Sequence, residues 1–167
     1  MKKLFVAGLI LACASIGAVR AQSTAPDDHA QLVALENQFA AAFRARDVEA
    51  VMKVYAPGST FVFDLTTPRE YPSFEAYRKD WIALFSQYKG PIRFDITELS
   101  IVTDGKLAFS HSVQHMVATK LDGKKDELTA RVTDDYRKID GKWFVVVEHV
   151  SVPLDPKTFK PDMMSKP

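Results

Sequence analysis

The segment DDYRKIDGKWFVVVEHVSVP, residues 134–153, contains the turn on which the fold prediction rests. Asp140 and Gly141 form an Asp-Gly pair, which is favoured in two-residue β-hairpin turns because it tolerates positive φ. Apolar residues flank the pair, and the second arm contains three consecutive valines. The segment therefore predicts two antiparallel strands joined by a tight turn. The second arm ends in the polar residues Glu148, His149 and Ser151, which suggest a role beyond packing.

Two further Asp-Gly pairs, Asp104-Gly105 and Asp122-Gly123, precede this hairpin. The three glycines are spaced 18 residues apart, so the pairs divide the C-terminal half into four strands. Consecutive hairpins of this kind predict a four-stranded antiparallel meander. Strands of about 14 residues are too long to stay flat in a domain of this size, so we expect them to twist and bend at bulges.

The region before the meander predicts three helices and one short strand. Asp28, Asp47 and Ser73 stand at the expected N-caps, and apolar side chains follow each of them at three- and four-residue spacing. The predicted helices cover residues 28–46, 47–55 and 73–89, and the β-branched and aromatic segment TFVFDL covers residues 60–65. The expected fold class is α+β, with a cone-shaped, curved antiparallel sheet wrapped around three N-terminal helices.

The N-terminal 21 residues resemble a secretory signal peptide. Two lysines precede an apolar stretch that is slightly short for a membrane span, and small residues follow it. We expect cleavage after Ala21, with a cut after Ala14 as the alternative, and a periplasmic or secreted product. A lipoprotein acylated at Cys13 is a second alternative, although Leu11 is bulky for that signal. A polar linker, residues 22–29, then leads to one domain, residues 30–154, and an extended tail, residues 155–167.

Composition excludes several functional classes. Cys13 is the only cysteine, so a mature chain has no disulfide or thiol nucleophile. Loss of three cationic residues with the signal peptide changes the formal net charge from +1 to −2, and no basic patch follows. Nucleic acid is therefore not an expected partner, because its binding needs many phosphate-neutralising contacts. No later segment is apolar enough to cross a membrane, and no cofactor motif is present.

The candidate site follows from assuming two-residue turns at Asp122-Gly123 and Asp140-Gly141, with no bulge nearby. Direct partners then share a face of the sheet. This pairing places His111 opposite Asp134, and the same face collects further polar side chains. These further side chains are His115, Tyr136, His149 and Ser151. The opposite face is more polar and carries Ser110, Ser112, Gln114 and Glu148. We expect the first face to line a cavity inside the cone.

Three other interpretations remain open at this point. Each strand histidine is individually more typical of a satisfied structural residue, and His149 with Ser151 also suits a dimer interface. Metal binding by His111, His115 and His149 with Asp134 or Glu98 is the third. Spacing along one strand separates His111 from His115 by about 13 Å, so a single ion would require a sharp fold.

The chain resembles the SnoaL-like, steroid-isomerase-like branch of the nuclear transport factor 2 superfamily. The resemblance rests on TFVFDL (60–65), FEAYRKDW (74–81), GPIRFDI (90–96) and RVTDDYRKIDGKWFVVVEHVSVP (131–153). It implies a cone-shaped α+β fold, a homodimer and a deep pocket for a small hydrophobic molecule. It does not imply one chemistry, because the superfamily contains isomerases, cyclases, dehydratases and non-enzymes. No definite positions match the tyrosine-plus-acid oxyanion hole of steroid isomerases.

Two functions remain candidates. In the first, a cofactor-free isomerase or dehydratase uses Asp64, His111 and Asp134 as catalytic groups, because relatives place an acid near position 64 and some use a His-Asp pair. Tyr136 would donate a hydrogen bond, and Tyr77 and Trp81, from the apolar stripe of the third helix, would line the pocket. In the second, the cone only binds a hydrophobic ligand in the periplasm, and the polar cluster orients it.

Overall fold

The computed structural model describes residues 27–164 of the chain. Its elements are α1 (Asp28–Ala45), α2 (Val48–Met52), β1 (Phe61–Phe63), α3 (Phe74–Ser86), β2 (Tyr88–Thr103), β3 (Leu107–Lys120), β4 (Lys125–Ile139) and β5 (Lys142–Ser151). The predicted signal peptide, its cleavage site and most of the linker lie outside the described residues, as does the end of the tail. Export therefore stays a prediction.

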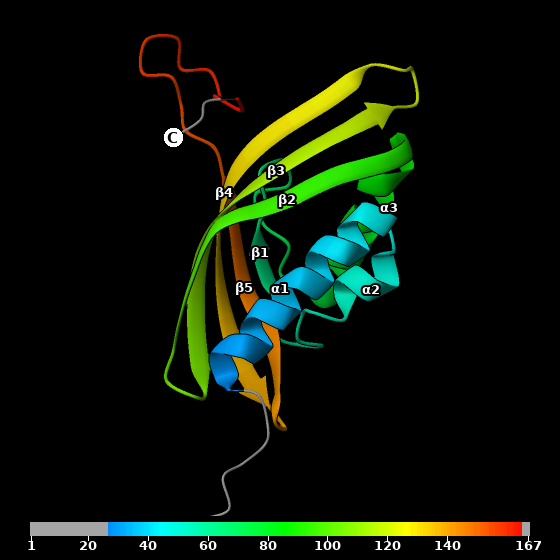
Figure 1. The fold of residues 1–167 in the computed structure, drawn as a ribbon. Helices are drawn as coiled ribbons and strands as arrows, with labels where there is room; N and C mark the ends of the chain where they lie inside the picture. Colours follow the sequence, from blue (N-terminus) through cyan, green and yellow to red (C-terminus); the bar gives the residue numbers. More distant parts are fainter. Residues whose placement is uncertain (1–26, 165–167) are drawn as a thin grey trace, which may run out of the picture.

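The five strands form one sheet in the order β1-β5-β4-β3-β2. The four long strands are antiparallel neighbours in chain order, which confirms the predicted meander, and β1 is added in parallel beside β5. Figure 1 shows the long strands bending strongly, with the three helices covering the concave side. The predicted α+β cone is therefore correct. The sheet has an inner face against the helices and an outer face that turns away from them.

Local signals at the helix starts are largely as predicted. The Asp47 side chain accepts a hydrogen bond from Ala50 N at 3.0 Å, and Ser73 Oγ accepts one from Ala76 N at 3.2 Å. The predicted cap at Asp28 is wrong, because Asp27 holds that position and accepts from Ala30 N at 2.7 Å. Asp28 begins the helix and instead bonds to Lys138 and Trp143 on the sheet.

An aromatic cluster joins α1 and α3 to the sheet. The Phe43 ring stacks on Phe94 of β2 with centroids 4.1 Å apart, and meets Trp81 and Phe85 edge-on at 5.4 Å each. Phe39, one turn earlier on α1, contacts Trp81 and Phe94 in the same way. Burial of these large rings supplies the main stabilisation of the helical layer on the sheet.

The turn between β3 and β4 differs from the prediction by one residue. Lys120 N donates to Lys124 O at 2.8 Å, which leaves a three-residue loop, residues 121–123. Gly123 has φ +91°, as expected for the left-handed residue that ends such a loop. A one-residue change of register moves every side chain of a strand to the other face. The predicted inner and outer faces of β3 are therefore exchanged.

The Asp140-Gly141 turn has two residues as predicted, both with positive φ, and pairs Ile139 with Lys142. A bulge interrupts the ladder farther along, because Tyr136 lies opposite Val145 whereas the preceding residue lies opposite Val147. Val146 is the extra residue. The side chains of β5 before Val146 therefore point to the predicted faces of the sheet. Those after Val146 point to the opposite faces.

The tail folds back against the sheet over its described part. Leu154 pairs with Pro161, and Thr129 N of β4 donates to Met163 O at 2.8 Å. Met163 thereby reaches the edge of the cavity described below. Within residues 27–164, no helix combines the length and hydrophobicity needed to cross a membrane.

Candidate functional site

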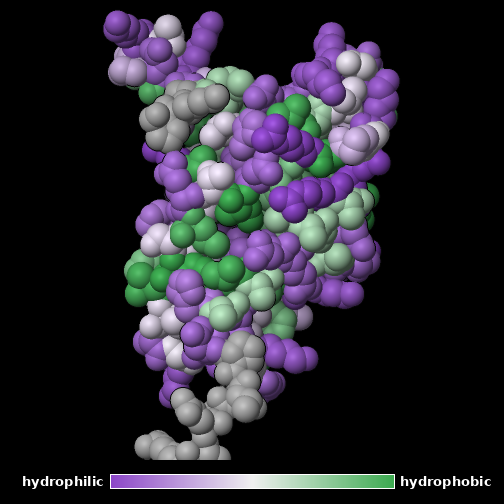
Figure 2. Space-filling view, in the orientation of Figure 1, coloured by the Kyte–Doolittle hydropathy of each residue, from purple (hydrophilic) through white to green (hydrophobic). Residues whose placement is uncertain are grey.

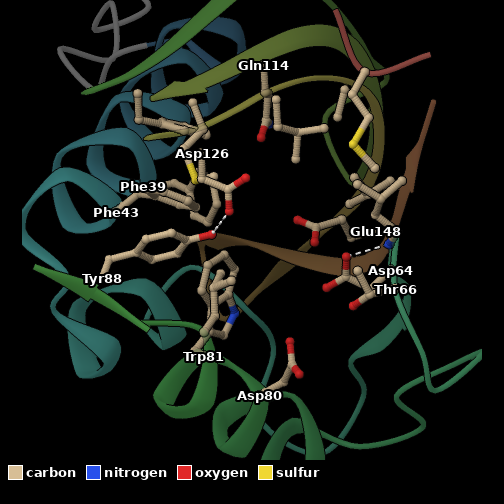
Figure 3. Close-up of a pocket in the computed structure, with 18 of the residues that line it drawn as sticks. Phe39, Phe43, Asp64, Thr66, Asp80, Trp81, Tyr88, Gln114, Asp126 and Glu148 are labelled. Carbon is tan, nitrogen blue, oxygen red and sulfur yellow. Dashed lines mark hydrogen bonds between the residues drawn. The ribbon is translucent and has the colours of Figure 1, made fainter. Parts of the chain in front are cut away.

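A cavity of about 240 Å³ lies between α1, α3 and the inner face of the sheet. Its walls are mainly apolar, and Figure 3 shows Phe39, Phe43 and Tyr88 on one side of it and Asp64 and Glu148 on the other. The apolar and aromatic lining residues are Phe39, Phe43, Leu65, Tyr77, Trp81, Leu84, Tyr88, Phe94, Met116, Leu128, Ala130, Val150 and Met163. Concave apolar walls with a few convergent polar groups are typical of small-molecule sites.

Glu148 is the most deeply placed acid of the cavity. It is 5% exposed, and the hydroxyls of Tyr55 and Tyr77 donate to its Oε2 and Oε1 at 2.7 and 2.6 Å. Burial raises the pKa of Glu148 to about 7, against the effect of these two hydrogen bonds, which lower it. Burial and the Glu148 charge raise the pKa of both hydroxyls, so they remain donors. A carboxyl group that titrates near neutrality can both take and return a proton.

A second acid, Asp64, lines the cavity from the segment that follows β1. Burial raises its pKa, and the negative charge of Asp80 raises it further. Asp80 itself accepts a hydrogen bond from the Tyr71 hydroxyl at 2.6 Å. Asp64 therefore lines the cavity, as the family resemblance implied, and lies beside Glu148 on the side opposite Phe39 and Tyr88 (Figure 3).

Two further acids lie behind Glu148. Asp134 is the direct cross-strand partner of Glu148 and is 2% exposed, and burial with the charge of Glu148 raises its pKa well above the ordinary value. Glu36 of α1 accepts a hydrogen bond from the Tyr136 hydroxyl at 2.7 Å, and burial raises its pKa. Ser110 Oγ is 2.8 Å from the same hydroxyl. Glu36, Asp134 and Glu148 share the wall of a void of about 10 Å³.

The predicted histidine cluster does not line this cavity. His111 lies opposite Thr133 rather than Asp134, and its side chain is exposed on the outer face. His115 pairs with Glu127, Nε2 to Oε1 at 2.9 Å. His149 packs its ring 5.8 Å from Phe63, and Ser151 follows it on the same face. The predicted His111-Asp134 pair is therefore wrong, because the three-residue loop exchanges the faces of β3. The bulge at Val146 does the same for His149 and Ser151.

The other predicted residues are on the inner side. Tyr77 and Trp81 line the cavity as predicted, and Asp134 and Tyr136 lie buried beneath it. The metal alternative gains no support, since residues 27–164 contain no group of three or more suitable ligands placed to hold one ion. Glu148 and Tyr55 are the residues that the sequence-based prediction missed. The available signal for Glu148 was an acidic residue inside an apolar strand, because burying a carboxylate costs free energy that a structural role alone does not explain.

A model of the SnoaL-like domain family matches residues 32–155. The chain belongs to the SnoaL-like family. This SnoaL-like domain is also similar in structure to a nuclear transport factor 2-like protein of unknown function from Pseudomonas putida KT2440. The two share 26% identity and a TM-score of 0.74 over 84% of this chain and 99% of that one. The predicted membership of the nuclear transport factor 2 superfamily is confirmed.

Two more distant structures share the fold of this SnoaL-like domain. One is a proposed dehydratase of the nuclear transport factor 2-like family from Streptomyces avermitilis, with 14% identity and a TM-score of 0.67 over 77% of this chain and 97% of that one. The other is a proposed scytalone dehydratase from Novosphingobium aromaticivorans DSM 12444, with 12% identity and a TM-score of 0.69 over 76% and 85%. No curated protein matches the chain.

Proposed function

We propose that this SnoaL-like domain is a cofactor-free acid/base enzyme of the isomerase or dehydratase type, acting on a small, mainly apolar molecule. The observation that carries the proposal is Glu148, a carboxyl group held by two tyrosine hydroxyls in the wall of an apolar cavity. Its pKa of about 7 suits proton transfer near neutral pH. The fold shared with proposed dehydratases supports the reaction class at the level of analogy.

The chemistry can be written with these groups alone. The Glu148 carboxylate removes a proton from a carbon next to a carbonyl, and the electron pair of that bond moves into an enolate. The enolate oxygen accepts a hydrogen bond from Trp81 Nε1, a buried donor with no partner among the described residues. Return of the proton by Glu148 to another carbon of the conjugated system gives an isomer. Departure of a β-hydroxyl, protonated by Asp64, gives an unsaturated product and water.

Solvent deuterium exchange tests this step without knowledge of the natural substrate. We expect the protein to accelerate exchange at the carbon next to the carbonyl of one-ring and two-ring ketones such as 1-indanone, followed by NMR. The rate should rise as pH increases through about 7 and then level off, because Glu148 acts as the base only when ionised. Exchange no faster than in buffer across such a panel would contradict the acid/base proposal.

Ligand binding without catalysis is the second candidate function. The observation that favours it is the state of Glu148, whose two oxygens are each already engaged by a tyrosine hydroxyl. A ligand bound with measurable affinity but no exchange would support this alternative.

The outer face suits the predicted homodimer, which we propose forms through its apolar strip. Val102 of β2 and Phe109 of β3 are direct cross-strand partners, and their side chains are 52% and 51% exposed. Leu107 lines a surface groove together with Val102 and Phe109, and its side chain is 54% exposed. Figure 2 shows hydrophobic surface among polar residues at the left of the molecule, where the sheet lies in Figure 1. Exposed apolar strips of this kind mark interaction surfaces.

Replacing Phe109 by Ser is expected to convert the dimer to a monomer, measured by light scattering during size-exclusion chromatography. The side chain is on the surface, so the fold should persist. Ile82→Ser is the matched control, because Ile82 is 46% exposed on α3, away from the outer face. A wild-type protein that is monomeric at high concentration would refute the dimer.

A further inference from the structure

The charge of the cavity lining is one-sided. Five acidic residues contribute to it, and the described lining contains no lysine, arginine or histidine. The chain as a whole has 22 Lys and Arg against 21 Asp and Glu, so this bias does not follow from composition. The acidic lining residues are Asp64, Asp80, Asp126, Glu127 and Glu148. A site of this kind favours cations over anions.

Two of these acids already have cationic or imidazole partners. Lys120 Nζ lies 3.3 Å from Asp126, and His115 Nε2 lies 2.9 Å from Glu127. Asp64, Asp80 and Glu148 have no ion-pair partner within residues 27–164, and only neutral hydroxyl or backbone donors contact them. They lie close enough for the charge of Asp64 to raise the pKa of Glu148, and that of Asp80 to raise the pKa of Asp64.

A separate observation indicates that a ligand completes the site. Trp81 is 5% exposed and lines the cavity, yet its Nε1–H has no acceptor among the described residues. An unpaired buried donor costs free energy, which a ligand oxygen would recover. Trp81 also stands beside Tyr77 and Phe39, with ring centroids 5.4 and 5.9 Å away, so aromatic faces border the space next to the acids. Aromatic faces attract cations in addition to packing against apolar groups.

We propose that the ligand of this cavity is a small aromatic or alicyclic amine, bound in its protonated form. The ammonium group lies among Asp64, Asp80 and Glu148, the ring packs against Trp81 and Phe39, and a neutral oxygen of the ligand accepts from Trp81 Nε1. The inference rests on the proposed function in that it names the substrate class for the same cavity. The volume of about 240 Å³ restricts the body to one or two rings, since pockets for drug-sized ligands measure ~300 Å³ or more.

Calorimetric titration of the protein comprising residues 22–167 with three matched probes tests the inference. The probes are 1-aminoindane, 1-indanol and indane-1-carboxylate, which share one body and differ in charge. At pH 8 we expect the amine to bind at least about tenfold more tightly than the alcohol, and the carboxylate to bind most weakly. Lowering the pH to 6 should weaken the amine several-fold and leave the alcohol unchanged, because Glu148 becomes protonated.

Asp80→Asn provides the variant, since Asp80 has no assigned part in proton transfer. It should lower the affinity for the amine about tenfold and leave that for the alcohol unchanged. Glu70→Gln, an exposed acid outside the cavity, is the control and should change neither. If the alcohol binds as tightly as the amine, the amine inference is overturned and the proposed function stands. If none of the three probes binds, both are overturned.

Discussion

Replacing Glu148 by Gln is expected to slow the catalysed deuterium exchange at least about a hundredfold. The amide keeps the size of the side chain but has no basicity, and a positioned general base contributes typically 10² to 10⁴ in rate. The neighbouring Tyr55 and Tyr77 hydroxyls lose a carboxylate acceptor but can still bond to the amide oxygen. The measurement is the exchange rate of the best ketone of the panel at pH 8, by NMR, for variant and wild type.

Two comparisons separate a chemical role of Glu148 from a structural one. Tyr77→Phe removes one of the hydrogen bonds that lower the pKa of Glu148, so its pH-rate profile should move to higher pH while exchange continues. His111→Ala should leave the rate unchanged, because the imidazole lies on the outer face. Wild-type exchange rates in Glu148→Gln would remove Glu148 from the mechanism. A hundredfold loss of the exchange rate in His111→Ala would contradict the placement of the active site in this cavity.

The folded protein is expected to be more stable at pH 5 than at pH 8. A carboxyl group whose pKa is higher in the folded state binds more protons there, so the free energy of unfolding falls as pH rises from the unfolded pKa to the folded one. For Glu148 this window runs from its ordinary value of 4.5 to about 7. At ~1.4 kcal/mol per pKa unit, the shift corresponds to about 3 kcal/mol. Burial also raises the pKa of Asp134 and Glu36, so these two groups make the free energy of unfolding fall more steeply with pH.

Urea unfolding followed by circular dichroism at several pH values between 5 and 8 measures this slope. The surface acids Asp104 and Asp122 do not interfere, because backbone N–H groups hold their pKa below the ordinary value of 3.8, outside this range. Glu148→Gln is the matched variant and should show a shallower slope. Stability that rises between pH 5 and 8, or an equal slope in the variant, would show that Glu148 titrates normally.

Short-range signals predicted much of the fold because the physics that they report is local. The caps at Asp47 and Ser73 and the turn at Asp140-Gly141 each involve hydrogen bonds or φ values within a few residues. The position of Asp64 in the cavity wall came from the family resemblance, since strand alternation placed it only on the same face as Val62. The length of the strands predicted the curved, cone-shaped sheet, and the apolar stripe of the third helix predicted that Tyr77 and Trp81 line the pocket.

Which residues line the site depends on two one-residue features of the sheet, the three-residue loop between β3 and β4 and the bulge in β5. The local sequence does not show whether either feature is present. An Asp-Gly pair suits both a two-residue and a three-residue loop, and the longer loop turns Ser110 and Ser112 inward and His111 outward. A run of three valines has equal strand propensity with or without a bulge, and the bulge at Val146 turns Glu148 inward. The two loop lengths, and the strand with or without its bulge, differ mainly in which side chains they bury against the helices.

The amino-acid sequence by itself determined the helices, the four-stranded meander and the hairpin at Asp140-Gly141. Only the tertiary structure decided which face of β3 and of the end of β5 meets the helices. The reason is the two-residue period of a strand, by which a shift of one position exchanges the faces completely. Ser110 and Glu36 are the hydrogen-bond partners of the Tyr136 hydroxyl, and Tyr55 with Tyr77 gives Glu148 its hydrogen bonds. These partners come from segments distant in the chain, so the choice is made when the helices pack on the sheet.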